Sequence, residues 1–356
     1  RQDFATPTRV GLATALGGFL LEALAVLAGL GVPGVLGASL LVSIGALAAF
    51  ARACERDRAA DGPGPPLPSA GGIARYAAAR FALGALALVT WTRFEVAFLG
   101  AYWNASEVAF YALPFGVVGA AVQLLPGSIS AVLPAAYPER RARGGEGAAA
   151  DLYRRAFFQM AAVGLPLGAL GAVLAGPLVS LVFTERFLPC VPVVRVLAVG
   201  AVLSMVTSAA SHLVLSSSKA PWMILVVGAG AAANVGLDFA WIPRGGALGA
   251  AWANTASQLF ESALAVAAAA ATCAVRPPGG RLATLLLPLA ACVAVGVLVM
   301  TLLRGNAWLG AGLGAPAMTA AYYGVGRVTG AFRREDLEAL RALLRFPGLP
   351  SRGTRA

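Results

Sequence analysis

Six ionisable residues lie inside long apolar stretches of the sequence, and these residues have the greatest capacity for chemistry. A charged side chain in an apolar span is costly, so such residues usually line an ion or substrate pathway or pair with another helix. Carboxylates can carry a proton or bind a cation, whereas a planar guanidinium suits a phosphate or diphosphate group. The six are Glu22, Arg80, Arg93, Glu95, Asp238 and Glu261.

The two arginines differ in depth. Counted from Arg75 at about 1.5 Å per residue, Arg93 lies about 27 Å along its predicted helix and Arg80 only about 8 Å. Arg80 can therefore reach the aqueous edge and act as an anchor, although it is also a candidate for substrate binding. Arg93 is predicted to bind an anionic ligand, or else to pair with a neighbouring helix. Glu95, two residues later, faces another side and either forms a structural hydrogen bond or responds to a coupling cation.

The remaining polar candidates have coupling or structural interpretations. Glu22 and Glu261 either carry protons or form hydrogen bonds between helices. Asn234 is predicted to join helices through hydrogen bonds. Asp238 is predicted to pair with Arg244 at the outer surface.

Sequence signatures of cofactor and metal chemistry are absent. The chain has no GxxxxGK[ST] loop and no HExxH motif. Its four cysteines have no CxxC spacing and are predicted to be free thiols. We therefore expect no cofactor and no metal centre, and only H⁺ or Na⁺ as a possible coupling ion.

The composition predicts an all-α integral membrane protein. The 356 residues are 59% hydrophobic and 12% charged, with a mean hydropathy of +0.78. Soluble domains carry roughly 25% charged residues, so an ordinary soluble enzyme and a disordered chain are excluded. About 20 apolar residues cross a bilayer as a helix. Ten such stretches are predicted, at about 10–30, 33–50, 74–99, 108–134, 156–183, 191–215, 221–242, 247–273, 282–303 and 307–327.

The positive charge follows the predicted topology. The net charge is +11, and Lys219 is the single lysine beside 26 arginines. Of these 27 cations, 21 fall in connections on one side of the predicted helices and 4 on the other. Positively charged loops mark the cytoplasmic side, so both termini are predicted to be cytoplasmic and nucleic acid is excluded as a partner.

An internal repeat organises these helices. Gly34-Val-Leu-Gly37-Ala38-Ser39 resembles Gly246-Ala-Leu-Gly249-Ala250-Ala251 at an offset of 212 residues, which also aligns Glu22 with Asn234. Repeats of helical blocks are typical of secondary transporters. The predicted parts are the last two helices of a first lobe (1–50), a cytoplasmic linker (51–72), a six-helix lobe (73–273), two extra helices (274–330) and an amphipathic tail (331–356). The offset further predicts that roughly 140 residues precede Arg1.

Several of these segments resemble a known family. Arg93-Phe-Glu95, Leu99-Gly100 and Val108-Ala-Phe-Tyr111 are similar to the seventh-helix signature of bacterial polysaccharide flippases, with Glu95 where that signature has aspartate. Asn234-Val-Gly-Leu237 and Ile242-Pro243 through Ala251 resemble the eleventh and twelfth helices. These flippases belong to the multidrug/oligosaccharidyl-lipid/polysaccharide (MOP) exporter superfamily, which includes the MATE transporters.

The resemblance implies a MATE-like fold of about ten transmembrane helices whose first lobe is incomplete. It implies no enzyme activity, but the flipping of undecaprenyl-diphosphate-linked oligosaccharide across the bacterial inner membrane by alternating access, in the biosynthesis of surface polysaccharide such as O-antigen. The implied partners are this lipid-linked oligosaccharide, membrane lipids, and possible contacts with a polysaccharide polymerase and glycosyltransferases. Arg93, Glu95 and Arg80 would then line the substrate cavity, with Glu22, Asn234, Asp238 and Glu261 as coupling or structural residues.

Three other functions stay open at this point. A multidrug/cation antiporter and a lipid II flippase belong to the same superfamily. A membrane-embedded glycosyltransferase is a different class, and the lack of a large outer loop with clustered acids argues against it.

Overall fold

The computed structural model describes residues 5–61, 71, 74, 78, 81, 84, 94–124, 126–303, 306–333, 335 and 336. Over these residues the chain is helical and contains no strand, which confirms the predicted all-α class. Six of the described helices are long and apolar enough to cross a membrane. The chain forms two compact units, Arg1–Tyr76 and Ala77–Ala356.

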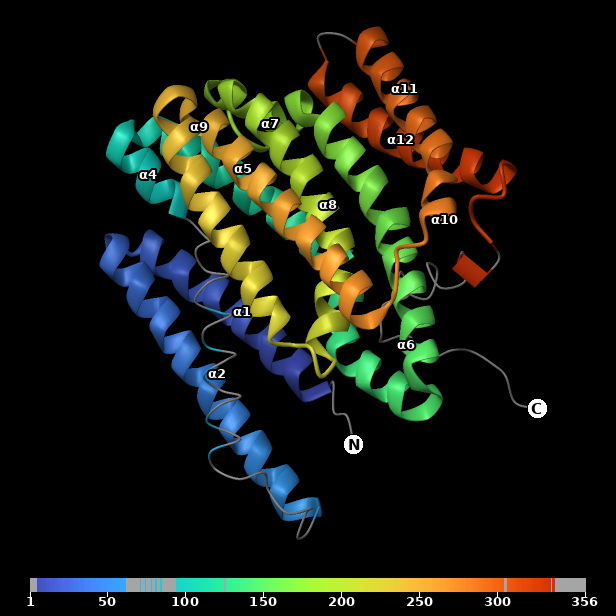
Figure 1. Cartoon of the computed structure of the whole chain (residues 1–356). Helices are drawn as coiled ribbons and strands as arrows, with labels where there is room; N and C mark the ends of the chain where they lie inside the picture. Colours follow the sequence, from blue (N-terminus) through green and yellow to red (C-terminus); the bar gives the residue numbers. More distant parts are fainter. Residues whose placement is uncertain are drawn as a thin grey trace, which may run out of the picture. The chain divides into compact units, whose positions relative to one another are not determined.

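The first unit contains a helical hairpin. Helix α1 (Ala5–Leu27) and helix α2 (Gly31–Asp61) pack against each other (Figure 1). The short connection contains Gly29 and Gly31, whose φ angles of 69° and 59° are left-handed and favour glycine. Helix α2 continues to Asp61, into the segment predicted to be a linker, and most of 62–72 lies outside the described residues.

In its described residues the second unit is a bundle of longer helices with four short ones, α4, α7, η1 and α10. Helix α8 lies between α6 and α9 and packs extensively against both (Figure 1). The C-terminal hairpin of α11 and α12 packs on α6 and α7. The elements are α4 (Phe94–Tyr102), α5 (Ala105–Leu124), α6 (Pro126–Val173), α7 (Ala175–Val182), the 3₁₀ helix η1 (Glu185–Cys190), α8 (Val191–Leu215), α9 (Trp222–Cys273), α10 (Gly279–Ala283), α11 (Leu286–Leu302) and α12 (Ala307–Val328).

Small residues allow α6 and α8 to approach closely. A methyl group added at Gly164 would lie 3.0 Å from Val202, and one at Gly168 would lie 3.3 Å from the same side chain. These glycines are spaced as in the GxxxG motif, which brings helix backbones together in membranes. At these two glycines the backbones of α6 and α8 pack closely within the apolar core.

Two predicted spans have different boundaries in the structure. The stretch 108–134 was predicted as one helix, but α5 ends at Leu124 and α6 begins at Pro126, since proline lacks an N–H donor and suits the first position of a helix. The stretch 156–183 is divided between α6 and α7 near Pro177. Periodicity alone did not reveal these breaks because both sides are equally apolar.

Both longest helices are interrupted. Within α6 the chain leaves the helical conformation at Gly144 and Gly145, which has φ 68°. Within α9 it does so at Gly246, which has φ 53°. Each of these helices is therefore a pair of arms, and the break in α9 falls between the two spans predicted at 221–242 and 247–273.

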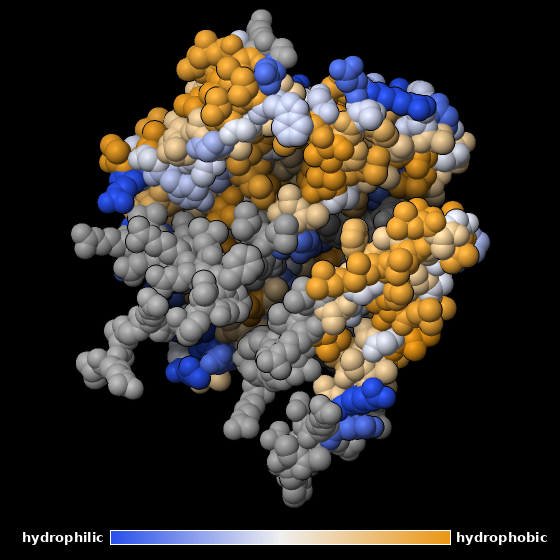
Figure 2. Space-filling view, turned by 180° about the vertical axis from the view of Figure 1, so that it is seen from behind, coloured by the Kyte–Doolittle hydropathy of each residue, from blue (hydrophilic) through white to orange (hydrophobic). Residues whose placement is uncertain are grey.

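The surface of the described residues is broadly apolar. Large hydrophobic side chains such as Leu225, Phe239 and Leu298 are more than half exposed. Figure 2 shows wide hydrophobic areas (orange) on one face, with hydrophilic residues (blue) gathered in smaller patches. A surface of this kind suits contact with lipid. Cys190, Cys273 and Cys292 are free thiols, as predicted. The predicted tail at 331–356 lies mostly outside the described residues.

Candidate functional site: a buried polar cluster

A carboxylate from α4 joins the two arms of α9. Glu95, near the start of α4, is 0% exposed. Its Oε1 atom accepts a hydrogen bond of 2.8 Å from Asn254 Nδ2 and one of 3.2 Å from Asn234 Nδ2. Asn234 and Asn254 lie on opposite sides of the break at Gly246. Glu95 thus holds both arms through a single oxygen.

The hydrogen bonds continue from this carboxylate to α8. Ser257 Oγ accepts from Asn234 Nδ2 at 3.0 Å and donates to the Asn254 carbonyl at 2.9 Å. Gln258 Nε2 donates to Asn254 Oδ1 at 2.7 Å, and Ser204 Oγ of α8 donates to Gln258 Oε1 at 2.9 Å. All of these side chains are buried. We call this network, together with Asp238 and Tyr111, the polar cluster.

Several oxygen atoms of the polar cluster have no hydrogen-bond donor among the described residues. These atoms are both carboxylate oxygens of Asp238, Glu95 Oε2 and Asn234 Oδ1. Asp238 is 0% exposed and lies one helical turn after Asn234. Buried carboxylates without partners are very unfavourable unless a proton or a cation compensates them. Oxygen ligands of this kind suit a hard cation.

Tyr111 of α5 completes the cluster. It is 1% exposed, and its hydroxyl lies near enough to the Glu95 and Asp238 carboxyls to interact with both. The hydroxyl makes no direct hydrogen bond of good geometry within the described part of the chain. A hydroxyl both donates and accepts, so it can adjust to either charge state of its acidic neighbours.

The predicted site residues fall into three groups. Arg80 and Arg93 lie outside the described residues. Glu95, Asn234 and Asp238 come together in the polar cluster. Glu22 and Glu261 make other contacts.

Those other contacts join neighbouring helices. Glu22 accepts a hydrogen bond of 2.6 Å from Ser39 Oγ of α2. Glu261 packs across the α9 arms on Gly230, where an added methyl group would lie 2.6 Å from its Oε2. That oxygen has no hydrogen-bond partner among the described residues.

The predicted Asp238–Arg244 ion pair is wrong. Arg244 is exposed and its Nη1 donates to the Ala240 carbonyl at 2.8 Å. Six residues of helix separate the two side chains by well over a quarter turn, so Asp238 faces the interior while Arg244 faces outward.

Sequence reasoning missed much of the cluster. Asn254, Ser257 and Gln258 occupy positions i, i+3 and i+4 of an apolar helix, which places them on one face. This polar face was a usable signal. Ser204 gave no signal by type or spacing, and Tyr111 stood out only as part of the family signature.

A second set of contacts holds the break in α9. Trp103 Nε1 donates to the Ile242 carbonyl at 2.8 Å, and Glu107 Oε2 accepts from the Ala247 backbone N–H at 2.7 Å. The backbone groups beside a helix break lose their intrahelical partners, and these two side chains replace them. The segment joining α4 and α5 is therefore fastened to α9 close to Gly246.

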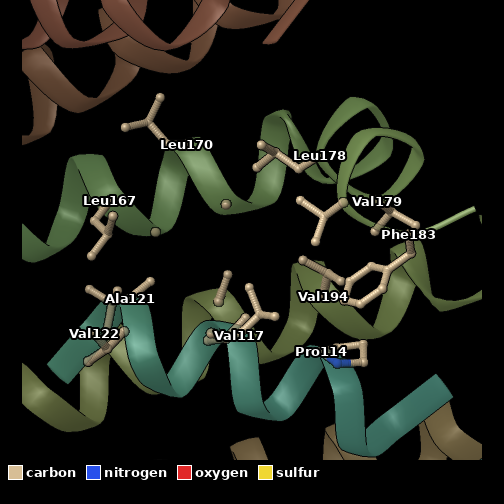
Figure 3. A pocket seen from close by; sticks show the side chains of 16 residues that line it. Pro114, Val117, Ala121, Val122, Leu167, Leu170, Leu178, Val179, Phe183 and Val194 are labelled. Atoms are coloured by element: carbon tan, nitrogen blue, oxygen red, sulfur yellow. The ribbon is translucent and has the colours of Figure 1, made fainter. Parts of the chain in front are cut away.

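A separate pocket of about 200 Å³ lies between α5, α6, α7 and α8. Figure 3 shows aliphatic and aromatic side chains around it, among them Val117, Leu170 and Phe183. No ionisable side chain lines this pocket. It can take hydrocarbon, but it offers no partner for a phosphate or a sugar.

The fold has known relatives. The structure described as "Lipid II flippase MurJ, inward closed conformation" superposes on 97% of this chain and 69% of that chain, with a TM-score of 0.68 and 12% identity. A structure titled "Crystal structure of MATE in complex with MaD3S" covers 74% of this chain and 68% of that chain, with a TM-score of 0.45 and 17% identity. The first of these superpositions shows that the chain has a MurJ-type fold.

The sequence comparison adds the family. Residues 1–192, more than half of the chain, match the sequence profile of the family described as "Polysaccharide biosynthesis protein". The chain belongs to this family of multi-pass membrane proteins. None of the curated proteins matches it.

Proposed function

We propose that this protein flips a lipid-linked oligosaccharide, carried on undecaprenyl diphosphate, across the bacterial inner membrane for surface polysaccharide biosynthesis. The observation that carries this proposal is the family match over residues 1–192, joined to a flippase fold over 97% of the chain. Moving a diphosphate sugar through hydrocarbon is costly because its charges and hydroxyls lose water. Alternating access between two lobes, with 73–273 as one complete lobe, avoids this cost.

Arg93, Glu95 and Arg80 have separate proposed roles. The two guanidiniums would contact the diphosphate, since Arg suits phosphate oxygens. Glu95 lies two residues beyond Arg93, so a change at the substrate would reach the polar cluster directly. No covalent step is involved. Both termini would be cytoplasmic. Glycosyltransferases would act before the flip, and a polymerase would act after it.

The polar cluster supports a further part of the proposal, namely coupling. Its buried carboxylate oxygens that have no donor among the described residues are suited to bind H⁺ or Na⁺. Binding there would bias the arrangement of α4 and the two α9 arms. Energy for an uphill flip would then come from the ion gradient.

The test is complementation of a deletion strain. The wild-type gene should restore surface polysaccharide, Arg93→Ala should not, and Arg93→Lys should restore it in part. Restored polysaccharide with Arg93→Ala would remove that residue from the mechanism. Loss of drug resistance on deletion, with normal polysaccharide, would instead select a multidrug antiporter.

A lipid II flippase is the second candidate, and the superposition on that fold favours it. Deletion separates the two functions. A lipid II flippase is needed for the cell wall, so loss of viability with unchanged surface polysaccharide would select it. A viable deletion strain that lacks surface polysaccharide supports the first candidate.

A further inference from the structure

The two arms of α6 enclose a hollow near their turn at Gly144 and Gly145. The hollow measures about 150 Å³, and α6 changes direction sharply within its length (Figure 1). A single water needs only about 10–15 Å³ measured in this way, so there is space for a phosphate group. The lining residues are Arg140 of the first arm and Ala148, Asp151, Leu152 and Arg155 of the second arm.

Two arginines of α6 have no acidic partner among the described residues. Residues 126–173 contain five arginines and three carboxylates. All three carboxylates are engaged, in the pairs Arg143–Glu139 at 2.8 Å, Arg141–Glu146 at 2.7 Å and Arg154–Asp151 at 3.1 Å. Within the described residues, Arg140 and Arg155 have no acidic partner, and both line the hollow.

The paired arginines have structural roles. Arg141 also donates to the carbonyl of Ser216, the residue that ends α8, at 2.7 Å. A cation at a helix C-terminus stabilises the helix, and Arg141 is thereby committed to this contact. Arg140 and Arg155 are exposed, and neither has an acidic partner among the described residues. Two guanidiniums that line one hollow and have no acidic partner among the described residues suit a phosphate group, which accepts forked hydrogen bonds.

We propose that this hollow binds the phosphate of an anionic phospholipid in the leaflet that the arginine distribution predicts to be cytoplasmic. A lipid fits better than a soluble anion because the hollow lies in a helix long and apolar enough to cross a membrane. Leu152 lines it, and Val132, Ala136 and Arg140 follow one ridge of the first arm, with Val132 49% exposed. An acyl chain can run along that ridge below the bound phosphate. The site goes beyond the proposed flipping activity.

The test is binding of short-chain phosphatidylglycerol to the purified full-length chain in neutral detergent, followed by the rise in Tm. Wild type should be stabilised, and the double variant Arg140→Gln with Arg155→Gln should bind about tenfold or more weakly, since charged hydrogen bonds to phosphate are lost. A matched control, Arg143→Gln with Lys219→Gln, removes the same charge from exposed residues outside the hollow. It should bind within about twofold of wild type. The lipid-free Tm of each variant checks that it folds.

Three results would overturn the proposal. Equal losses in both double variants would mean diffuse attraction of the basic surface. Equal stabilisation by zwitterionic phosphatidylcholine, or by inorganic phosphate at the same concentration, would remove the anionic lipid as the ligand. Tighter binding of farnesyl diphosphate, lost in the Arg140/Arg155 variant, would assign the hollow to the diphosphate of the transported molecule.

Discussion

The α1–α2 hairpin and the two arms of α9 follow one sequence pattern at an offset of 212 residues, yet their polar residues make different contacts. In both, a polar residue on the first helix bonds to a serine on the second, Glu22 to Ser39 and Asn234 to Ser257. In α9 alone, within the second unit, a third helix adds Glu95. The contact in the α1–α2 hairpin joins two helices, whereas the contact in α9 belongs to a buried network that includes α4.

This contrast separates polar residues that only link helices from those with a candidate function. Glu22 is half-buried and its bond to Ser39 accounts for it as a link between helices. The polar cluster has more acceptor atoms than the described residues satisfy, so its composition exceeds what a link between helices needs. The same repeat thus provides a scaffold in one place and a candidate ion site in the other.

The largest effect is expected from Glu95→Ala. The change removes the oxygen that accepts hydrogen bonds from Asn234 Nδ2 and Asn254 Nδ2, and each lost buried hydrogen bond costs roughly 1–3 kcal/mol. We expect loss of surface polysaccharide and a lower Tm for the purified protein. Glu95→Gln, which keeps an oxygen acceptor and removes the charge, should keep most of the Tm but not the transport. Normal transport by Glu95→Gln would exclude a role for the charge.

Asp238→Asn should separate stability from transport. The variant removes a buried carboxylate that has no donor among the described residues, so the Tm should be unchanged or higher. Export should fall by about tenfold or more if this carboxylate binds the coupling ion, since a charged partner is worth about 1.5–3 kcal/mol. Export rates in proteoliposomes with imposed H⁺ or Na⁺ gradients measure this. Export that keeps its full ion dependence would assign Asp238 a structural role.

The two repeats should respond differently to the same glycine substitution. A methyl group at Gly249 would collide with the backbone carbonyl of Trp241, whereas one at the equivalent Gly37 meets nothing within 4 Å. Gly249→Ala should therefore cost about 1–3 kcal/mol through overpacking. Gly37→Ala should be neutral or slightly stabilising, because alanine favours helix. Denaturation midpoints of the two variants give the comparison, and equal midpoints would contradict the structural difference between the hairpins.

Glu22→Ala should have the smallest effect. The lost hydrogen bond to Ser39 is worth about 0.5–1.5 kcal/mol, and the serine hydroxyl can turn to a nearby backbone carbonyl. Polysaccharide export should stay within about twofold of wild type. A loss of export as large as that of Glu95→Ala would show that both repeats take part in coupling. Glu22 would then be more than a link between helices.

Much of the fold was predictable because the length of each apolar stretch is a local property of the sequence. The division of α9 near Gly246 followed from the two apolar stretches at 221–242 and 247–273, and the link between helices at Asn234 followed from a polar residue inside an apolar span. The breaks beside Pro126 and Pro177 were missed, since their flanks are apolar on both sides. The site was harder, because Glu95 and Asn254 are 159 residues apart and only folding brings them together. Asp238 was assigned to Arg244 by proximity in sequence, although helix geometry points the two apart.

The left-handed residue at Gly246 gives the 52-residue α9 one joint in an otherwise stiff rod. Trp103 and Glu107 clamp that joint from one side, while Glu95 ties the two rods together farther along. The two arms of α9 are therefore connected at Gly246 and again at Glu95. The angle between the arms depends on the length of the hydrogen bonds at Glu95. We expect the charge carried at Glu95 and the angle between the arms of α9 to vary together, as one coordinate of motion.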